Sequence, residues 1–271
     1  MKNKLIKGIA LVGILTTMTM GLVGCGAKED VYDTVKEAGV LKVGMSADYA
    51  PYEYHAIIDG KDQVVGFDVD IAKEIAKDLD LELEIVEMEF GSLVTAVKQG
   101  KIDMVISGMT PTDERKKEVD FTDIYYTADQ TFLIKESDKD TYTTLSDLEG
   151  KKVGAQLGTI QADMANDIKD AEVKLLADVG VLLLELENGN LDAVVIEYPV
   201  ASMAALKNNK LFVPDERIKD GTGGSAIAIA KKSPRFLKEV NKSLKKMIDA
   251  DKIKVFEEKA LEQVIYQVEE K

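Results

Sequence analysis

The chain of 271 residues has few of the residues from which many reactive sites are built. It contains one cysteine, Cys25, one histidine, His55, and no tryptophan. A single cysteine excludes a disulfide or a multi-thiolate metal cluster within the chain, and a single histidine excludes a zinc site with several imidazole ligands. We therefore expect no metal, no other cofactor and no catalytic residues, and we expect His55 to lie in a polar loop at the surface.

Basic residues are also in deficit. The chain has 35 lysines and arginines against 49 aspartates and glutamates, which gives a net charge of −14. This balance argues against nucleic acid or an anionic membrane surface as a general partner. Hydrophobic residues make up 45% of the chain, which is enough at this length to fill the cores of two domains of ordinary size.

Only the amino terminus has a long hydrophobic run. Lysines 2, 4 and 7 precede the apolar segment 9–20, which ends in Leu-Val-Gly-Cys at 22–25. This pattern predicts a secretory signal over residues 1–24. A membrane helix is the less favoured alternative, because the run is interrupted before it reaches about 20 residues.

The end of this segment resembles a lipobox, in which Cys25 receives a diacylglycerol and becomes the mature amino terminus. Acyl chains such as palmitate would then anchor the protein to the cell membrane, since stable anchoring needs two such signals. Removal of the three lysines of the leader leaves 35 − 3 = 32 basic residues against 49 acidic ones, a net charge of −17.

The most informative stretch is IDMVISGMTPTDER at 102–115. Its apolar start predicts a buried strand, and ligands of α/β sheets lie beyond the carboxyl ends of such strands. Ser107 and Thr110 offer hydroxyls, and Gly108 lets the backbone come close to a ligand. Arg115 offers a planar charged fork suited to a carboxylate. The stretch predicts a carboxylate receptor, with Arg115 on a solvated helix face as the alternative.

Together with VDFTD at 119–123, this stretch resembles the signature of family 3 extracellular solute-binding proteins, the amino-acid receptors of ABC importers. The resemblance covers about residues 38–262. It implies a type II periplasmic-binding-protein-like fold, with two α/β domains, two hinge crossovers and a free amino acid clamped between the domains. The implied partners are an ABC transporter permease and, through it, its ATPase, and the implied location is extracytoplasmic.

The resemblance also suggests how the chain is divided. After the signal peptide at 1–24, residues 25–37 are expected to form a tether, because the segment 28–40 is charged and lacks a sustained apolar face. Domain 1 is discontinuous, with residues 38–127 and 226–271. Domain 2 takes residues 128–225 and includes the hinge segments, of which the glycine-rich 221–225 holds the return crossing.

The resemblance places the ligand contacts on both domains. Arg115 would hold the ligand carboxylate, Tyr49 and Phe90 would be flat walls beside its side chain, and Glu197 would pair with its α-ammonium group. Family members commonly have aspartate at the position of Glu197. The full implied set is Ser46, Tyr49, Phe90, Ser107, Gly108, Thr110 and Arg115 from domain 1, with Gln156, Gly158, Thr159, Ile160, Gln161 and Glu197 from domain 2.

Other roles stay open for several of these residues. Tyr49 and Phe90 could belong to the core, as could the neighbouring Tyr52 and Tyr54, and Glu197 could be a surface acid. In the segment 66–79 we expect a helix with a buried apolar face and Asp68 as its cap.

The expected ligand is an amino acid with a polar or basic side chain, because Ser46 and Gln156 give the lining polarity without a decisive charge. Two other functions stay open. One is a cyclohexadienyl or arogenate dehydratase, since a few proteins of this fold act on cyclic carboxylic acids. The other is a receptor module that feeds a signalling partner. The lipobox and the ion pair for a zwitterion argue against the enzyme.

Overall fold

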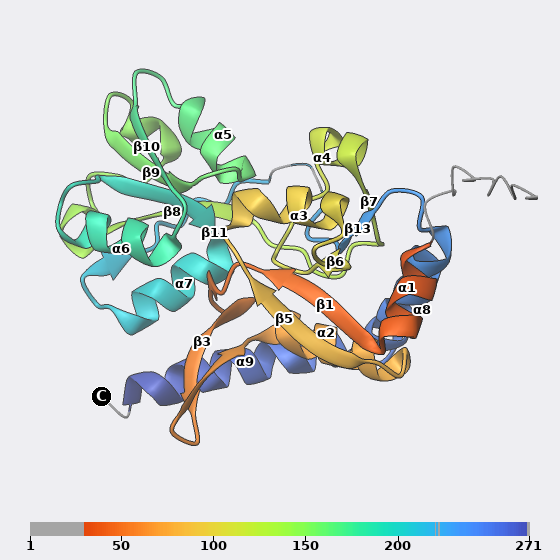
Figure 1. Cartoon of the computed structure of the whole chain (residues 1–271). Helices are drawn as coiled ribbons and strands as arrows, with labels where there is room; N and C mark the ends of the chain where they lie inside the picture. Colours follow the sequence, from red (N-terminus) through yellow and green to blue (C-terminus); the bar gives the residue numbers. More distant parts are fainter. Residues whose placement is uncertain (1–29, 220, 222, 270–271) are drawn as a thin grey trace, which may run out of the picture.

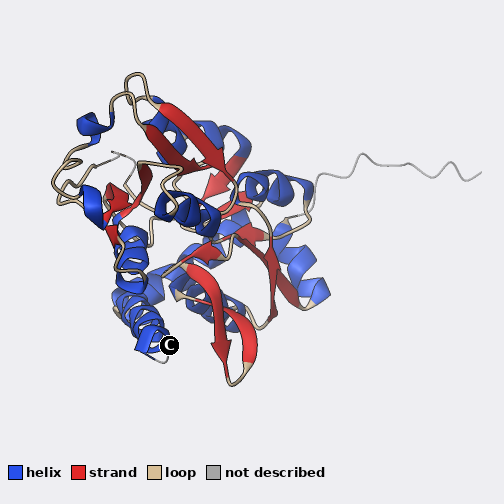
Figure 2. Ribbon diagram, turned by 90° about the vertical axis from the view of Figure 1, so that its left-hand side faces the viewer, coloured by secondary structure: helices blue, strands red, loops and turns tan. Residues whose placement is uncertain are grey.

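The computed structural model describes residues 30–219, 221 and 223–269. The predicted signal peptide, the lipidation residue Cys25 and the first part of the predicted tether lie outside these residues, as does Thr222 of the predicted return crossing. Figures 1 and 2 show two α/β lobes side by side. Each lobe is built around a five-stranded sheet.

The sheet of the first lobe has the strand order β5-β1-β6-β13-β7. β1 is parallel to β5 and β6, whereas β13 is antiparallel to β6 and β7. The predicted strand at 102–106 is buried as expected, but only two of its residues join the ladder. The strands are β1 (Val40–Met45), β5 (Glu82–Glu87), β6 (Met104–Val105), β7 (Val119–Phe121) and β13 (Ala228–Ala230).

The sheet of the second lobe has the order β10-β9-β11-β8-β12. β9 is parallel to β10 and β11, and β8 is antiparallel to β11 and β12. Every residue of β11 is buried, as its continuous apolar run predicts. The strands are β8 (Gln130–Lys135), β9 (Lys152–Gln156), β10 (Glu172–Leu176), β11 (Ala193–Glu197) and β12 (Leu211–Phe212).

The chain passes between the lobes twice, from β7 to β8 and from β12 back to β13. Two isolated bridges, Tyr126 to Ser225 and Gln130 to Ile218, join the outgoing and returning segments. Two α/β sheets connected by a pair of crossing segments confirm the predicted fold class.

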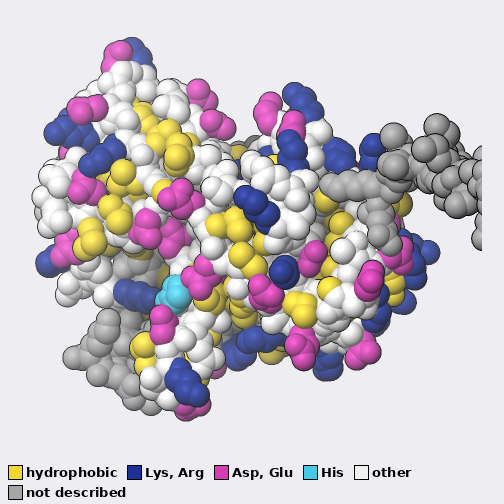
Figure 3. Space-filling model, viewed as in Figure 1, with side chains coloured by type: hydrophobic (Ala, Val, Ile, Leu, Met, Phe, Trp, Pro, Cys, Tyr) yellow, Lys and Arg dark blue, Asp and Glu magenta, His cyan; other side chains and the backbone are white. Residues whose placement is uncertain are grey.

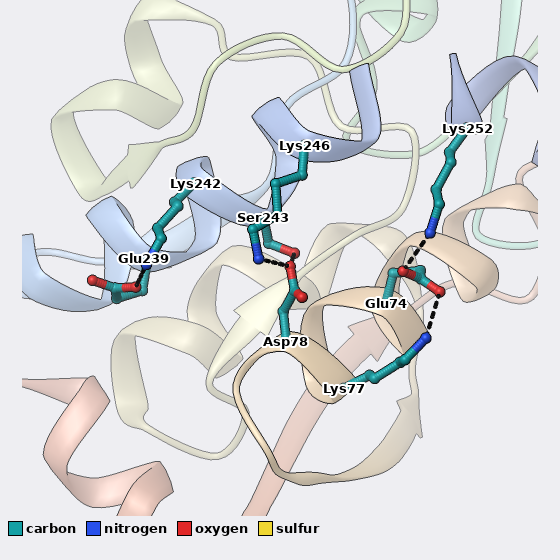
Figure 4. A network of polar contacts seen from close by, with 8 residues as sticks. All are labelled: Glu74, Lys77, Asp78, Glu239, Lys242, Ser243, Lys246 and Lys252. Atoms are coloured by element: carbon teal, nitrogen blue, oxygen red, sulfur yellow. Dashed lines mark hydrogen bonds and ion pairs between the residues drawn. The ribbon is translucent and has the colours of Figure 1, made fainter. Parts of the chain in front are cut away.

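The first lobe is covered by helices that tie residues far apart in the sequence together. Figure 4 shows Asp78 of α2 accepting hydrogen bonds from the Ser243 hydroxyl (2.7 Å) and from Lys246 (3.0 Å), both on α8. The predicted apolar face at 69–79 is buried. The elements are α1 (Val31–Ala38), α2 (Phe67–Asp78), η1 (Phe90–Ser92), α3 (Leu93–Gln99), α4 (Asp113–Glu118), α8 (Pro234–Asp249) and α9 (Lys252–Glu269), with a small sheet of β2 (Asp48–Tyr49), β3 (Glu53–Ile58) and β4 (Lys61–Val65).

The second lobe has no helix as long as α2, α8 or α9 among its described residues, and one of its helices is only half buried. Val181 and Leu184 of α6 are 46% and 58% exposed, and Figure 3 shows hydrophobic side chains gathered over β10 and α6. None of the helices in the described part of the chain is long and apolar enough to span a membrane. The elements are η2 (Glu136–Asp138), η3 (Leu145–Leu148), α5 (Ile160–Asn166), α6 (Val179–Glu187) and α7 (Tyr198–Lys207).

The structure corrects the prediction of a tether, because residues 31–38 form the helix α1. Asp30 caps the helix by accepting a hydrogen bond from the backbone of Tyr32, and Val35 is 1% exposed. The carboxylate of Asp30 also accepts from the backbone N–H of Phe236 (3.2 Å) at the start of α8. The predicted tether therefore includes residues that pack on the first lobe.

Candidate functional site

Most of the predicted ligand contacts surround one hollow between the two lobes. It contains about 320 Å³ of empty space, its mouth included. Its lining also includes Glu53, which the sequence analysis did not select, whereas the predicted Gly158 and Glu197 are not part of it. The predicted residues that line it are Ser46, Tyr49, Phe90, Ser107, Gly108, Thr110, Arg115, Gln156, Thr159, Ile160 and Gln161.

Arg115 lies in the first turn of α4, the helix that Thr112 caps. Its guanidinium donates one hydrogen bond to the carbonyl of Thr110 (2.7 Å) and one to the carbonyl of Gly158 in the second lobe (2.9 Å). It also lies over the ring of Phe90, 5.1 Å from the centroid. Burial lowers the pKa of Arg115 to about 10, so it stays charged at neutral pH. Two of the five N–H donors of the fork are engaged, which leaves three for a carboxylate.

Asp48 of β2 fastens the two lobes together beside the hollow. Its carboxylate accepts hydrogen bonds from the backbone N–H of Val179 (2.8 Å) and from the side-chain amide of Gln156 (3.2 Å), both in the second lobe. It also accepts from the hydroxyl of Ser46 in its own lobe (3.1 Å). Together with the bond from Arg115 to Gly158, these contacts hold the lobes in a closed arrangement.

Both glycines of the predicted contact set have backbone conformations that favour glycine. Gly158 has φ +81°, and a Cβ there would lie 3.2 Å from the Cα of Gly91 in the other lobe. Gly108 has φ +54°, and a Cβ there would lie 3.4 Å from the ring of Tyr52. Both conformations favour glycine. Gly158 does not line the hollow, but its lack of a side chain lets the two lobes come close, and its carbonyl accepts a hydrogen bond from Arg115.

The wall from the second lobe is the start of α5. Thr159 is the N-cap: its hydroxyl accepts from the backbone of Ala162 (3.2 Å) and donates to the carbonyl of Gln156 (2.7 Å). The side-chain amide of Gln161 donates to Gln130 on β8 (2.8 Å). The predicted main-chain donors at 159–161 therefore lie in the first turn of a helix, where N–H groups have no partner within the helix itself.

The aromatic residues divide between the core and the hollow. Tyr52 and Tyr54 are 0% and 4% exposed, so the core alternative holds for both. Tyr49 lines the hollow while its ring packs 5.5 Å from that of Tyr52. Phe90 is 8% exposed and belongs to a core cluster, yet its ring also faces the hollow beneath Arg115.

Glu197, at the end of β11, is 4% exposed, which excludes the surface alternative. Its carboxylate accepts from the side-chain amide of Gln130 (3.4 Å). Burial, followed by the charge of Glu197, raises the pKa of both Tyr49 and Tyr52. The carboxylate therefore lies close to these rings, behind the lining rather than in it.

The structure brings together two acidic residues that the sequence analysis did not connect with the binding site. Glu53 and Asp68 are both 0% exposed. Glu53 accepts a hydrogen bond from the hydroxyl of Ser107 (2.5 Å), and Asp68 accepts from the backbone of Gly108 (2.9 Å) and the hydroxyl of Tyr125 (2.8 Å). Burial raises the pKa of Glu53 well above its usual value and that of Asp68 to about 6.

The position of Asp68 corrects the prediction that it caps a helix. The N-cap of α2 is Gly66, which makes no side-chain cap, and Asp68 lies inside the first turn. Its carboxylate instead holds the Ser107-Gly108 turn of the receptor stretch through the backbone N–H of Gly108. The sequence signal was an acid in an otherwise apolar helix face, a position that requires partners when buried.

A second hollow of about 700 Å³, which also includes Ser46, has four acidic residues among the nine that line it. His55 lies at its edge, on strand β3 rather than in the predicted loop, and is exposed as expected. It is hydrogen-bonded to Asp62 (3.0 Å) and Glu87 (2.7 Å), and these two bonds raise the pKa of the imidazole. In the described part of the chain, no three or more histidine, cysteine, aspartate or glutamate side chains are grouped so that they could hold a metal ion.

Two lobes, two crossing segments and a polar hollow with one arginine fork define a receptor that encloses a small ligand. Residues 41–263 match the bacterial extracellular solute-binding proteins of family 3, and the chain belongs to this family.

Known relatives agree with this membership. The chain is 38% identical over 259 residues to the arginine-binding extracellular protein ArtP of Bacillus subtilis (strain 168), covering 92% of this chain and 96% of the relative. It is 37% identical over 222 residues to a protein of Campylobacter jejuni named "Probable histidine-binding protein", covering 81% and 84%.

Among solved structures, it resembles the amino acid ABC transporter substrate-binding protein AbpA of Streptococcus pneumoniae bound to L-arginine. The TM-score is 0.83 at 38% identity, over 86% of this chain and 99% of that one. The protein is thus an extracytoplasmic solute-binding protein that serves amino-acid uptake through an ABC importer.

Proposed function

We propose that the protein binds a free amino acid with a cationic side chain, L-arginine foremost, in the hollow between its lobes. The observation that carries this proposal is the charge of the lining. Arg115 is its one cationic side chain among the described residues, and Glu53 is a fully buried carboxyl group in the same wall. A ligand with a carboxylate at one end and a cation at the other complements this arrangement.

More carboxyl groups surround the hollow than a simple zwitterion needs. The proposed role of Glu197 is to pair with the α-ammonium group, as the family resemblance implies. Glu53 then remains for a cationic side chain. Asp48 lies next to the hollow, where it accepts hydrogen bonds from the lining residues Ser46 and Gln156, and it adds a further acidic group there. The two named relatives are called arginine-binding and histidine-binding, and the solved relative holds L-arginine, which supports the same ligand class.

Binding is proposed to stabilise the closed arrangement of two domains, residues 38–127 with 226–271 and residues 128–225. Groups from both lobes line the hollow. A ligand that needs both sets of groups binds the closed form better than the open one, and this difference in affinity shifts the population. The closed form would be recognised by an ABC permease, which acts with its ATPase.

We further propose that the mature protein begins at Cys25 and is held at the outer face of the cell membrane by a lipid on that residue. Support comes from the basic start, the apolar core and the Leu-Val-Gly-Cys ending of the leader. The proposal includes no catalytic step and no cofactor.

Calorimetry against the twenty amino acids and L-citrulline tests the ligand. Citrulline has the shape of arginine without its charge, so it isolates the contribution of the cation. We expect arginine to bind at least about tenfold more tightly than citrulline, or about 1.4 kcal/mol in binding free energy. Tightest binding by an acidic or an apolar amino acid would contradict the proposal.

A further inference from the structure

Glu53 of β3, which lines the hollow, and Asp68 of α2, which does not, form a buried carboxyl pair. Each has one oxygen that accepts hydrogen bonds from the protein, from Ser107 for Glu53 and from Gly108 and Tyr125 for Asp68. The other oxygen of each, Oε2 of Glu53 and Oδ1 of Asp68, is buried and receives no hydrogen bond from a donor. The two side chains are within hydrogen-bonding reach of each other.

One proton between these two oxygens accounts for the arrangement. Two buried carboxylates cannot both carry a full charge side by side without a large energetic cost, and unpaired buried oxygens are also costly. A proton on Oε2 of Glu53 that is donated to Oδ1 of Asp68 satisfies both oxygens and leaves the pair with a single negative charge.

The surrounding groups do not supply a positive charge to replace that proton. Asp48 acts on Glu53 and is itself acidic, and the hydroxyl of Tyr125 faces Asp68. Glu197 acts on Tyr125 from the other lobe. Arg115 lies in the same wall, but its guanidinium donates to the carbonyls of Thr110 and Gly158. The neutral hydroxyls of Tyr49 and Tyr126 also lie close, the first to Glu53 and the second to Asp68.

We propose that Glu53 and Asp68 share one proton in the ligand-free protein, and that a cationic group of the bound amino acid takes the place of that proton on Glu53. The O–H bond of Glu53 breaks, the proton passes to the solvent, and an N–H group of the ligand donates to the resulting carboxylate. The pair and its positive partner keep a net charge of −1 throughout. This inference rests on the proposed function and adds a proton to its binding equilibrium.

Asp68 is then a positioning residue, because it does not line the hollow and acts through Glu53. It fixes the direction of the shared proton, while its own bonds to Gly108 and Tyr125 keep its carboxylate in place. The proton on Glu53 competes with the ligand cation for the carboxylate, and raising the pH removes this proton. Affinity for arginine therefore rises with pH, by at most tenfold per pH unit for one proton.

The test is calorimetry of the wild-type chain with L-arginine at pH 7, in phosphate and in Tris, which have different heats of ionisation. The difference in apparent enthalpy gives the number of protons exchanged. We expect release approaching one proton per arginine. Arginine binding without proton release would overturn the inference while the proposed function stands, whereas the absence of binding by any amino acid would remove both.

L-citrulline identifies which cation replaces the proton. Release with arginine but not with citrulline assigns the place to the guanidinium of the side chain. Release with both ligands assigns it to the α-ammonium group, and the shared proton stands in either case. Because both ligands are measured on the wild-type protein, this result is independent of the folding of any variant.

Variants separate the proton from the structure. Glu53→Gln removes both the charge and the proton, so arginine should bind more weakly and release none. Asp68→Asn places an amide N–H beside Glu53, which leaves Glu53 ionised, so arginine should bind with no proton release and with an affinity independent of pH. Asp78→Asn on the same helix is the control and should release protons as the wild type does. A pH profile of Asp68→Asn identical to that of the wild type would contradict the role of Asp68.

Discussion

Replacement of Arg115 gives the sharpest test of how the hollow holds its ligand. The guanidinium is fixed by the carbonyls of Thr110 and Gly158 and by the ring of Phe90, so its remaining N–H groups point from a rigid position. Two charge-assisted hydrogen bonds to a ligand carboxylate contribute roughly 1.5–3 kcal/mol each. Arg115→Ala should therefore weaken binding by roughly 3–6 kcal/mol, or about 10²- to 10⁴-fold.

Arg115→Lys should not restore the affinity, because a point-like ammonium cannot make two parallel bonds. The assay is calorimetric titration of each variant with arginine, accompanied by a denaturant unfolding curve to show that the fold is intact. Arg235→Ala is the matched control, since that arginine pairs with Asp33 on the exposed contact between α1 and α8. Wild-type affinity in Arg115→Ala would refute the reasoning, and equal loss in Arg235→Ala would show a general effect on the fold.

Three further predictions follow from other parts of the chain. Tyr49→Ala should lose about 2 kcal/mol of binding free energy with little change in unfolding free energy, because its ring lines the hollow; a variant that unfolds would favour a core role. Cys25→Ser should bind arginine normally but appear in the soluble fraction on cell fractionation, and retention in the membrane would contradict lipidation. The raised pKa of Asp68, about 6 against 3.8, should make it contribute stability below pH 3.8 that is lost as the pH rises through 6. Relative to Asp68→Asn, the ligand-free wild type should therefore lose unfolding free energy as the pH rises from 4 to 7 in urea titrations, and parallel pH profiles would contradict this.

The two-domain fold was predicted from the resemblance to the family, whereas local patterns in the sequence account for single strands and helices. Residues 81–88 alternate between apolar and polar side chains and residues 191–196 form an almost continuous apolar run, which are patterns typical of strands, and these segments contain most of β5 and β11. Helix α1 was missed because it buries little apolar surface, with Val35 as its one fully buried residue. It is held by Asp30 and by contacts to α8, which lies some two hundred residues away in the sequence, and no local pattern signals such a contact.

The predicted binding residues came from motifs, and most of them meet at one hollow. What the sequence could not indicate is which buried acids lie next to one another. Glu53 is the first residue of β3 and Asp68 lies in α2, which follows the β3–β4 hairpin, and only the folded chain brings the two together beneath Gly108. Glu197 illustrates the same limit, since its place behind Tyr49 depends on how the lobes close.

A crystal structure of the chain with L-arginine tests the central claim most directly. The account predicts one arginine between the lobes, its carboxylate within hydrogen-bonding distance of Arg115 and a cationic nitrogen within hydrogen-bonding distance of Glu53. Arginine bound outside this hollow, or bound within it with its carboxylate away from Arg115, would contradict the account.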